Sequence, residues 1–215
     1  YMIKILYYQY YDFQNFDFVL KFTKLSSISR YNYSNSFYRK EDVFNSALAY
    51  TLLCLGEKQF GLEISREDNG KPYIKGSDIS ISFSHTTGLV AIAISDHNIG
   101  IDCEKIDMID NEIKNITFSD LEIAHSESNP YYSTLFWTGK ESLSKLKNED
   151  WYSTKRTELY IEDNMLKDKN NEISFYYNVV SNGVICLASN LFREEVICRE
   201  VTEKEIRNFC LYNIY

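Results

Sequence analysis

Three apolar segments separated only by short turns occupy the middle of the chain, and they constrain the fold more than any other feature. In residues 79–84 (ISISFS) isoleucine and phenylalanine alternate with serine, which is the pattern of a strand with one buried face. Residues 89–95 (LVAIAIS) are apolar throughout, as in a central strand. In residues 99–104 (IGIDCE) the apolar side chains share one strand face, and Asp102 and Glu104 share the other. This run predicts strands of an antiparallel sheet.

Several flanking segments have the features of helices. In residues 40–55 the apolar side chains recur at helical spacing and form one face. Residues 109–128 are polar and indicate one or two short helices. Asn129 and Pro130 supply an N-cap and a first-turn proline for a helix that runs to about Leu146. The sequence therefore places helices on both sides of the predicted strands.

Further strands are expected toward both ends of the chain. Residues 2–8 (MIKILYY) predict an opening strand, and after Thr157 short apolar runs alternate with turns. A last helix is expected to begin near Thr202, where Thr-Glu-Lys-Glu forms a capping box. We predict an α+β fold of two similar halves, residues 1–108 and 109–215, each with antiparallel strands and packed helices. Because no low-complexity linker separates the halves, they should pack as one unit.

The composition excludes several classes of protein. The 215 residues include 23 Lys and Arg against 31 Asp and Glu, for a formal net charge of −8, whereas a general nucleic-acid binder carries a basic surplus. The longest apolar stretches, residues 50–55 and 88–94, are far shorter than the roughly 20 residues of a membrane span. The chain opens without a secretory signal pattern, and its five cysteines include no C-x-x-C pair. We expect a cytoplasmic protein with neither nucleic acid nor a membrane as partner, on which a local cluster of cations can still bind phosphates.

Asp102 and Glu104 form the first candidate site. Two carboxylates two residues apart on a strand project from the same face, about 7 Å apart along the pleat. Like charges this close repel unless a cation intervenes, and Mg²⁺ prefers oxygen ligands such as one or two carboxylates with substrate phosphates. The alternative is a solvated pair of acids at the edge of a sheet.

A second candidate site lies on the helix expected after Pro130. Trp137, Glu141 and Lys145 are four residues apart and share one helix face, with Lys140 nearby. A carboxylate that can bind a metal beside a lysine that can face phosphate is what phosphoryl-type transfer needs. The alternative is an ordinary surface ion pair between Glu141 and Lys145.

Two further segments offer groups that bind anions. Ser84 and His85 end the strand at residues 79–84 and can donate to phosphate oxygens, but no G-x-S-x-G elbow surrounds Ser84, so a hydrolase triad is not expected. Lys71 leaves a tight turn in the extended conformation that the following proline imposes. Each of these residues alone is compatible with a purely structural role. Arg30 is a further cation of the first half.

The order and spacing of these segments resemble the signature of the 4′-phosphopantetheinyl transferases of the Sfp type. GKPY at 70–73, FSHTTG at 83–88, IGIDCE at 99–104 and FWTGKESLSK at 136–145 follow the family pattern of G-K-P, S-H-(S/T), G-(I/V)-D-x-E and (F/W)-x-x-K-E-(S/A)-x-x-K. The match covers residues 70–145. The combination of the D-x-E and K-E-S-x-x-K motifs at this separation is specific.

The resemblance implies a function and a set of residue roles. Members of this family move the phosphopantetheine arm of coenzyme A onto a serine of an acyl or peptidyl carrier protein and release 3′,5′-ADP. The resemblance implies a monomer whose two α/β halves form a pseudo-dimer, with coenzyme A as co-substrate and Mg²⁺ or Mn²⁺ as the metal. It implies that Asp102, Glu104 and Glu141 hold the metal and that Asp102, Glu141 and Lys145 are the catalytic residues. It also implies phosphate or coenzyme A contacts by Arg30, Lys71, Ser84, His85, Lys140 and Lys145.

The sequence departs from the family pattern at three places. Asn45 stands where many members carry an arginine for the adenosine phosphate, and residues 146–150 replace a glycine-rich run. Residues 109–130, which help members of the family to dock the carrier protein, are unusually polar here. Two other functions stay open: a catalytically silent module that binds coenzyme A or a nucleotide, and a Mg²⁺-dependent phosphohydrolase that uses the same carboxylates.

Overall fold

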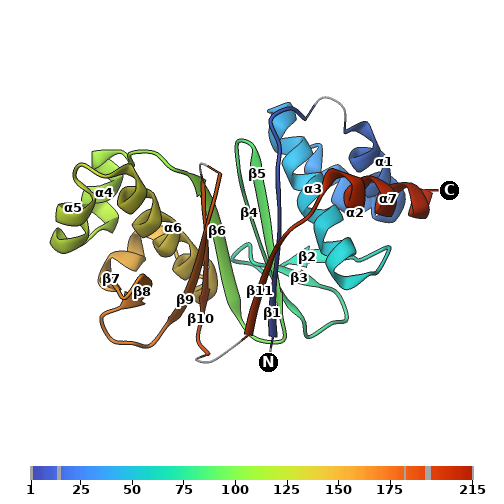
Figure 1. The fold of residues 1–215 in the computed structure, drawn as a ribbon. Helices are drawn as coiled ribbons and strands as arrows, with labels where there is room; N and C mark the ends of the chain where they lie inside the picture. Colours follow the sequence, from blue (N-terminus) through green and yellow to red (C-terminus); the bar gives the residue numbers. More distant parts are fainter. Residues whose placement is uncertain (1, 14–15, 182, 192–194, 215) are drawn as a thin grey trace.

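Two β-sheets face each other at the centre of the molecule, and helices cover the outer face of each sheet (Figure 1). The computed structural model describes residues 2–13, 16–181, 183–191 and 195–214. Within these residues, the first sheet has the strand order β11-β1-β5-β4-β3-β2 and the second has the order β6-β10-β9-β8-β7. The α+β class predicted from the sequence is confirmed.

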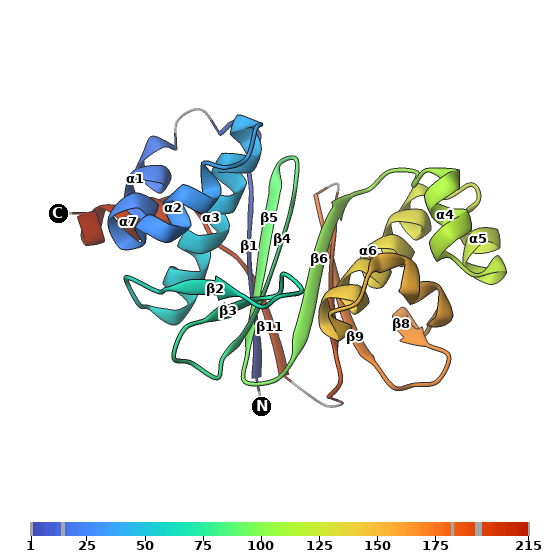
Figure 2. The same ribbon diagram turned by 180° about the vertical axis from the view of Figure 1, so that it is seen from behind.

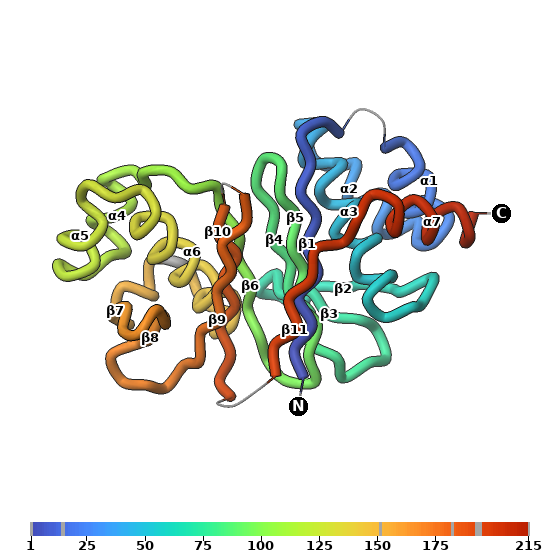
Figure 3. Tube along the Cα trace, in the orientation of Figure 1, coloured from blue at the N-terminus to red at the C-terminus, as the bar shows by residue number. Residues whose placement is uncertain are grey.

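The first sheet is antiparallel except at one edge. Its strands are β1 (Met2–Gln9), β2 (Ile64–Arg66), β3 (Pro72–Ile74), β4 (Ser80–Thr86), β5 (Leu89–Ser95) and β11 (Glu195–Glu200). Strand β11 runs parallel to β1, with Ile5 opposite Cys198. Figure 3 shows this pairing as the contact of the red C-terminal segment with the blue N-terminal one.

The second sheet is antiparallel and is built mainly from the C-terminal half of the chain. Its strands are β6 (Ile99–Lys105), β7 (Leu159–Glu162), β8 (Met165–Asp168), β9 (Ser174–Val180) and β10 (Gly183–Ser189). The turns at Asp163, Asn164 and Asn171 adopt positive φ, which asparagine and aspartate tolerate better than most residues.

The helices form the two outer layers (Figures 1 and 2). The first sheet is covered by α1 (Asp17–Ser26), α2 (Ile28–Ser34), α3 (Lys40–Glu57) and α7 (Glu203–Ile214). The second is covered by α4 (Asn111–Thr117), α5 (Asp120–Ser126), α6 (Pro130–Lys147) and the 3₁₀ helix η1 (Trp151–Arg156). No helix in the described ranges combines the length and the apolarity that crossing a bilayer requires.

The local predictions of helix ends are confirmed. The side chain of Asn129 accepts a hydrogen bond from the Tyr131 amide at 3.0 Å, so it caps α6 as expected. At α7 the Thr202 side chain accepts from the Glu205 amide, and the Glu205 carboxylate accepts from the Thr202 amide. These capping interactions use groups within three residues of each other, which is why the sequence alone predicts them.

The core between the sheets comes from the apolar faces of the strands. Ile5 of β1 and Ala91 of β5 belong to the same buried cluster as Ile101 of β6 and Ile185 of β10. The buried cluster on the other face of the first sheet includes residues of α3 and α1, and α6 contributes to those on the other face of the second sheet. Strands β1 and β5 are therefore covered on both faces, which explains why residues 89–95 are apolar without alternation.

Strand β4 differs from the half-buried strand predicted for residues 79–84. Its serine face is covered by β6, and Ser82 and Ser84 are buried. The Ser82 hydroxyl accepts from the Ile101 amide at 3.0 Å, and the Ser84 hydroxyl accepts from the Cys103 amide at 3.2 Å. Because β6 is the edge strand of its sheet, these amides have no ladder partner on that side, and the serine hydroxyls satisfy them.

The two sheets do not divide the chain at residue 108, where the boundary between the halves was expected. Strand β6 precedes that residue but pairs with β10 in the second sheet. Conversely, β11 and α7 return to the first sheet from the C-terminal end of the chain. Strand pairing depends on partners distant in the sequence, so local patterns locate a strand without assigning it to a sheet.

Candidate active site

Helix α6 lies directly on strand β6, and this close approach creates the candidate site. A Cβ atom added at Gly100 would lie 2.1 Å from the Ser142 carbonyl oxygen and 2.4 Å from the Leu146 amide nitrogen. Only glycine allows the helix backbone this close to the strand. The contact places the helix residues Glu141 and Lys145 next to Asp102, two positions beyond Gly100 on the same strand face.

Asp102 is the centre of the site. Its Oδ1 atom accepts a 2.7 Å hydrogen bond from the Ser84 hydroxyl and a 2.7 Å ion pair from the Lys145 ammonium group. The side chain of Asp102 is only 5% exposed, whereas that of Lys145 is 31% exposed. Its second oxygen, Oδ2, is buried and has no hydrogen-bond partner in the described part of the chain. A buried carboxylate oxygen without a donor carries a large desolvation cost, so Oδ2 is suited to a further cation.

Glu104 and Glu141 add two more carboxylates beside Asp102. Burial raises the pKa of Glu104 to about 7, and the charge of Asp102 acts in the same direction. Hydrogen bonds from Thr86 and Trp137 to Glu104 oppose the shift. Burial likewise raises the pKa of Glu141 to about 7, with Asp102 adding to the effect and Lys145 opposing it. The structure thus brings the strand acids and the helix acid, predicted from separate motifs, into one electrostatic cluster.

Lys145 is held in its charged form by these acids. Burial by itself lowers the pKa of a lysine, but the Asp102 carboxylate and the charge of Glu141 outweigh it and raise the pKa of Lys145. One ammonium group therefore faces three carboxylates, and the cluster keeps a negative excess when all of them are ionised.

The residue types of this cluster fit a hard divalent cation. Carboxylate oxygens are the ligands that Mg²⁺ prefers, and Asp102 Oδ2 offers a buried oxygen without a donor. The side-chain arrangement is not that of a finished metal centre, since in the described residues no three Asp, Glu, His or Cys side chains form a group ready to hold an ion. The chemistry of the donor set fits the metal, although the carboxylates are not grouped as in a preformed site among the described residues.

A cleft of about 660 Å³ lies between the first sheet and the end of α6. The β2–β3 hairpin contributes Arg66 and Lys71, strand β4 contributes Phe83, and α6 contributes Lys145. Lys145 therefore faces the cleft and the acidic cluster at the same time. Because the walls come from both sheet systems, the cleft is a shared pocket of the kind that a large anionic ligand needs.

Lys71, which the sequence offers as a possible anion-binding group, lines the cleft. Its ammonium group donates to the Asn98 side-chain oxygen, and the Asn98 amide donates to the Leu146 carbonyl at 2.7 Å. Burial lowers the pKa of Lys71, with the charge of Glu67 opposing the shift. This chain of hydrogen bonds ties the hairpin of the first sheet to the end of α6.

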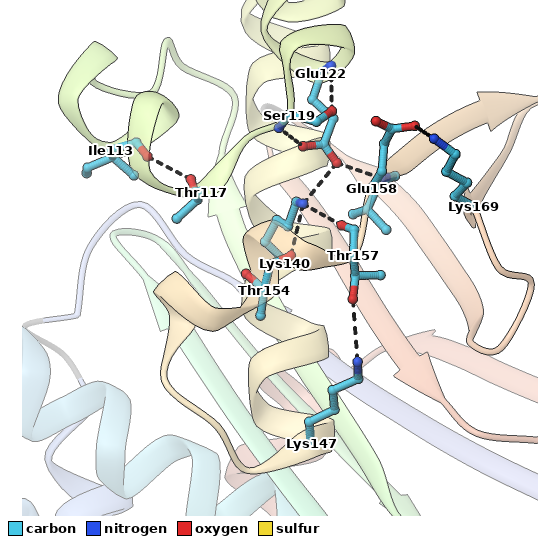
Figure 4. A network of polar contacts seen from close by, with 11 residues as sticks. Ile113, Thr117, Ser119, Glu122, Lys140, Lys147, Thr154, Thr157, Glu158 and Lys169 are labelled. Atoms are coloured by element: carbon cyan, nitrogen blue, oxygen red, sulfur yellow. Dashed lines mark hydrogen bonds and ion pairs between the residues drawn. The ribbon is translucent and has the colours of Figure 1, made fainter.

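The structure corrects the expectation that Lys140 binds phosphate. Its side chain is 0% exposed, and its ammonium group pairs with Glu122 at 3.0 Å and donates to the Thr154 and Thr157 carbonyls at 3.1 Å and 2.6 Å (Figure 4). Burial lowers the pKa of Lys140 and raises that of Glu122, and the pairing opposes both shifts. Lys140 and Glu141 are adjacent, so they point about 100° apart around the helix and reach different surroundings.

Arg30 is also placed away from the cleft. It is 6% exposed, and its guanidinium group donates to the carbonyl and the hydroxyl of Ser46 at 2.9 Å and 3.1 Å. The guanidinium group lies over the rings of Tyr33 and Phe83, and Phe83 separates it from the cleft that this ring lines. In this structure Arg30 therefore does not reach the cleft, and it would not contact a ligand bound there.

Ser84 and His85 lie on opposite faces of β4. Ser84 orients Asp102 and is buried, so it acts on the carboxylate and does not line the cleft. His85 is partly buried, and burial lowers its pKa, with the charge of Asp42 opposing the shift and that of Lys145 adding to it. The imidazole thus lies within electrostatic reach of both the α3 side and the acidic cluster.

The departures from the family pattern have structural counterparts. Asn45 is buried and accepts a 2.6 Å hydrogen bond from the Tyr10 hydroxyl. In the stretch that replaces the glycine-rich run, Asn148 ends α6 in the left-handed conformation with φ of 59°. Asparagine is the residue other than glycine that most often serves this purpose. The Asn148 amide also donates to Glu67 at 3.3 Å, across the cleft.

Sequence reasoning missed Arg66 and Tyr33 as residues of the cleft region. The Arg66 guanidinium group donates to the Tyr33 hydroxyl at 2.7 Å and also bonds to the Gly70 carbonyl. A signal was available, since Arg66 directly precedes the turn that carries Lys71 and so shares its hairpin. No motif marked it, because its role depends on a pairing with a helix residue 33 positions away.

Comparison with known proteins agrees with the motif resemblance. No protein-family model matches the chain. The chain is similar to a curated protein, the 4′-phosphopantetheinyl transferase gsp of Aneurinibacillus migulanus, with 28% identity over 158 residues. The similarity covers 67% of this chain and 65% of that relative, so the chain spans about two thirds of the relative's length. This similarity to a curated protein of that name supports the prediction of a 4′-phosphopantetheinyl transferase made from the motifs.

Proposed function

We propose that this protein transfers the phosphopantetheine arm of coenzyme A to a serine of an apo acyl or peptidyl carrier protein and releases 3′,5′-ADP. The observation that supports this most strongly is the Lys145–Asp102 ion pair, which joins the helix motif to the strand motif at the border of a cleft. The Sfp type is part of the proposal, because it rests on the motifs and not on the relative alone.

The proposed roles follow from the positions of the side chains. Asp102, Glu104 and Glu141 would hold Mg²⁺, which when bound neutralises pyrophosphate charge and polarises the phosphorus that is attacked. Lys145 and Lys71 would bind the phosphates from opposite walls of the cleft. Glu141 would accept the proton of the carrier serine, directly or through a water molecule. Charge neutralisation at phosphorus is the main requirement of this reaction, and the cluster supplies groups of both signs.

We also infer that the fold is a pseudo-dimer. Between β1 and β5 the described chain forms a strand, three α-helices and four strands, and between β6 and β10 it repeats this order with η1 added. In each sheet the first strand pairs with the last strand of its set, as in β1 with β5 and β6 with β10. The matching order supports two related halves, with β11 and α7 as additions to the first.

The decisive experiment is incubation with coenzyme A, Mg²⁺ and an apo carrier protein, followed by intact mass measurement of the carrier. A mass gain of one phosphopantetheine is expected. Release of 3′,5′-ADP from coenzyme A without a carrier would instead show a phosphohydrolase. Binding of coenzyme A with no transfer to any carrier tested would show a catalytically silent binding module, and either result would overturn the proposal.

A further inference from the structure

Asn98 connects the two walls of the cleft through its side-chain amide. It lies directly before β6, in the turn that follows β5. Its Nδ2 atom donates to the Leu146 carbonyl at the end of α6 at 2.7 Å, and its Oδ1 atom accepts from the Lys71 ammonium group of the β2–β3 hairpin. One short side chain therefore links the hairpin that carries Lys71 to the helix that carries Lys145.

The packing of β6 on α6 fixes the position of Asn98. Leu146 belongs to the last turn of α6, where the final carbonyl groups have no partner within the helix, and the Asn98 amide satisfies one of them. Two residues further on, Gly100 lies so close to the backbone of Ser142 and Leu146 that no Cβ atom would fit. The start of β6 is thus held against the end of α6, and Asn98 with it.

The backbone of Lys71 is restrained as well. Its amide donates to the Asn69 side-chain oxygen at 3.3 Å, and its carbonyl accepts from the Glu67 amide at 2.9 Å. The remaining freedom of Lys71 lies in its flexible four-carbon side chain. The bond to Asn98 restrains the end of that side chain, which lines the cleft.

Asn98 holds the Lys71 ammonium group without neutralising it. Across the described residues, no carboxylate lies within 4.0 Å of that group. The amide oxygen occupies one of the three N–H donors of the lysine, so the charge and two donors stay available for a ligand. A carboxylate at position 98 would neutralise Lys71 and could not donate to the Leu146 carbonyl. Asparagine can do both, because its side chain has one acceptor and one donor group.

A second bond between the hairpin and α6 distinguishes this role from a purely structural one. The Asn148 amide donates to the Glu67 carboxylate at 3.3 Å, so the hairpin and the helix end stay connected without Asn98. The Gly100 contact also holds β6 against α6 independently of Asn98. The specific contribution of Asn98 is therefore the placement of the Lys71 ammonium group.

We propose that Asn98 is a positioning residue that holds the charged Lys71 ammonium group in place at the wall of the cleft opposite Lys145. The inference rests on the proposed function, which supplies a ligand whose phosphates the two lysines would bind. It goes beyond that function, because Asn98 lies outside the four motifs and acts on the ligand only through Lys71.

The chemical reactivity of the Lys71 amine tests the positioning without any ligand. Trace acetylation with acetic anhydride, followed by peptide mass spectrometry, measures the labelling of Lys71 relative to the exposed Lys75 of the same protein. Asn98→Ala removes an acceptor that favours the ammonium form, so the relative labelling of Lys71 should rise about threefold, the effect of half a pKa unit. Asn98→Asp supplies a carboxylate instead and should lower the labelling by about the same factor.

Binding of coenzyme A, measured by isothermal titration calorimetry, tests whether this placement matters for a ligand. Asn98 is exposed, so Asn98→Ala should weaken binding only about fivefold, and Lys71→Met should weaken it about tenfold or more. The double variant should bind like Lys71→Met alone, because Asn98 then has no amine to hold. In a transfer assay, Asn98→Ala should raise the KM for coenzyme A and leave the KM for the carrier protein unchanged.

Asn213→Ala is a matched control. The Asn213 amide donates to the Phe209 carbonyl in α7 at 2.8 Å, which is the same kind of bond as that of Asn98 to α6, but it lies outside the cleft. This variant should match the wild type in Lys71 labelling and in affinity for coenzyme A. Thermal melting of each variant checks that the protein is folded.

The outcomes distinguish this inference from the proposed function. Unchanged labelling of Lys71 in both Asn98 variants would overturn the role of Asn98 whether or not coenzyme A binds. A loss of affinity in Asn98→Ala that is absent, or that is equally large with and without Lys71, would also overturn it, since Asn98 would then not act through Lys71. Labelling that changes as expected in a protein that binds no coenzyme A would support the positioning role and overturn the proposed function.

Discussion

Lys145 of α6 donates a 2.7 Å ion pair to the Oδ1 atom of Asp102 on β6, joining residues 43 positions apart in the sequence. The same oxygen accepts a 2.7 Å hydrogen bond from Ser84, which belongs to the other sheet. One carboxylate oxygen thus connects both sheets and the helix that carries the second motif. This relationship fixes the orientation of Asp102 and leaves its other oxygen free of protein donors among the described residues.

Replacing Asp102 with asparagine should abolish most of the activity while the protein stays folded. The amide keeps the shape of the side chain but removes the charge that pairs with Lys145, and we expect arm transfer to fall roughly 10²–10³-fold. Initial rates from intact mass of the carrier, with circular dichroism for the fold, measure this. Asp96→Asn, the same change at an exposed carboxylate in the turn before β6, should stay within about twofold of wild type. Equal rates in the two variants would contradict the assignment.

Removal of divalent metal should stop transfer, and Glu141→Gln should raise the Mg²⁺ concentration that transfer requires. We expect chelation by EDTA to abolish activity and added Mg²⁺ to restore it. In Glu141→Gln the Mg²⁺ concentration for half-maximal rate should rise at least roughly tenfold, because one of three proposed carboxylate ligands is lost. Glu149→Gln changes an acid of the cleft wall outside the proposed metal set, so its Mg²⁺ dependence should match wild type. Full activity in EDTA would refute the metal proposal.

Replacing Lys140 with methionine should destabilise the protein without removing ligand affinity. The substitution leaves the Glu122 carboxylate buried without its cation, which costs about 3–5 kcal/mol of unfolding free energy. Urea denaturation measures this cost, and the double variant Lys140→Met with Glu122→Gln should recover part of it. Lys147→Met, at an exposed position of the same helix, should change the unfolding free energy by less than about 0.5 kcal/mol. If the folded Lys140→Met variant no longer bound 3′,5′-ADP, this correction would be wrong and Lys140 would contribute to phosphate binding after all.

A methyl group at Gly100 should separate α6 from β6. The added Cβ would overlap the helix backbone at Ser142 and Leu146, so Gly100→Ala should cost roughly 3 kcal/mol of stability and reduce transfer by moving Lys145 from Asp102. Gly76→Ala is a suitable control, because Gly76 has open space around it and only its φ of +76° opposes a side chain. That strain costs about 1–2 kcal/mol and should leave transfer unchanged. A Gly100→Ala variant as stable and active as Gly76→Ala would contradict the close packing.

Local patterns predicted most elements at nearly their observed bounds. The helix expected at residues 40–55 is α3, and the strands expected at 89–95 and 99–104 are β5 and β6. The facing of Asp102 and Glu104 away from the apolar core was also predicted correctly. These features depend on side-chain periodicity and on caps, which involve neighbours in the chain.

The surroundings of individual cations were not predictable in this way. Lys140 and Lys145 lie on one helix that is buried on most sides, and the spacing shows only that they face different directions. Which of them meets Glu122 and which meets Asp102 depends on how α5 and β6 pack against α6. Arg66 was overlooked for the same reason, since Tyr33 and the opposite wall of the cleft come from distant segments.

The amino-acid sequence alone determined most of the elements, the motif order and the face of β6 that carries Asp102 and Glu104, because these follow from interactions between residues a few positions apart. Only the tertiary structure decided that β6 joins the second sheet, that β11 returns beside β1, and that Lys145 reaches Asp102 while Lys140 does not. The physical reason is that strand pairing, ion pairing and side-chain burial depend on segments distant in the sequence. Which of these segments covers a given residue depends on the packing of the whole chain.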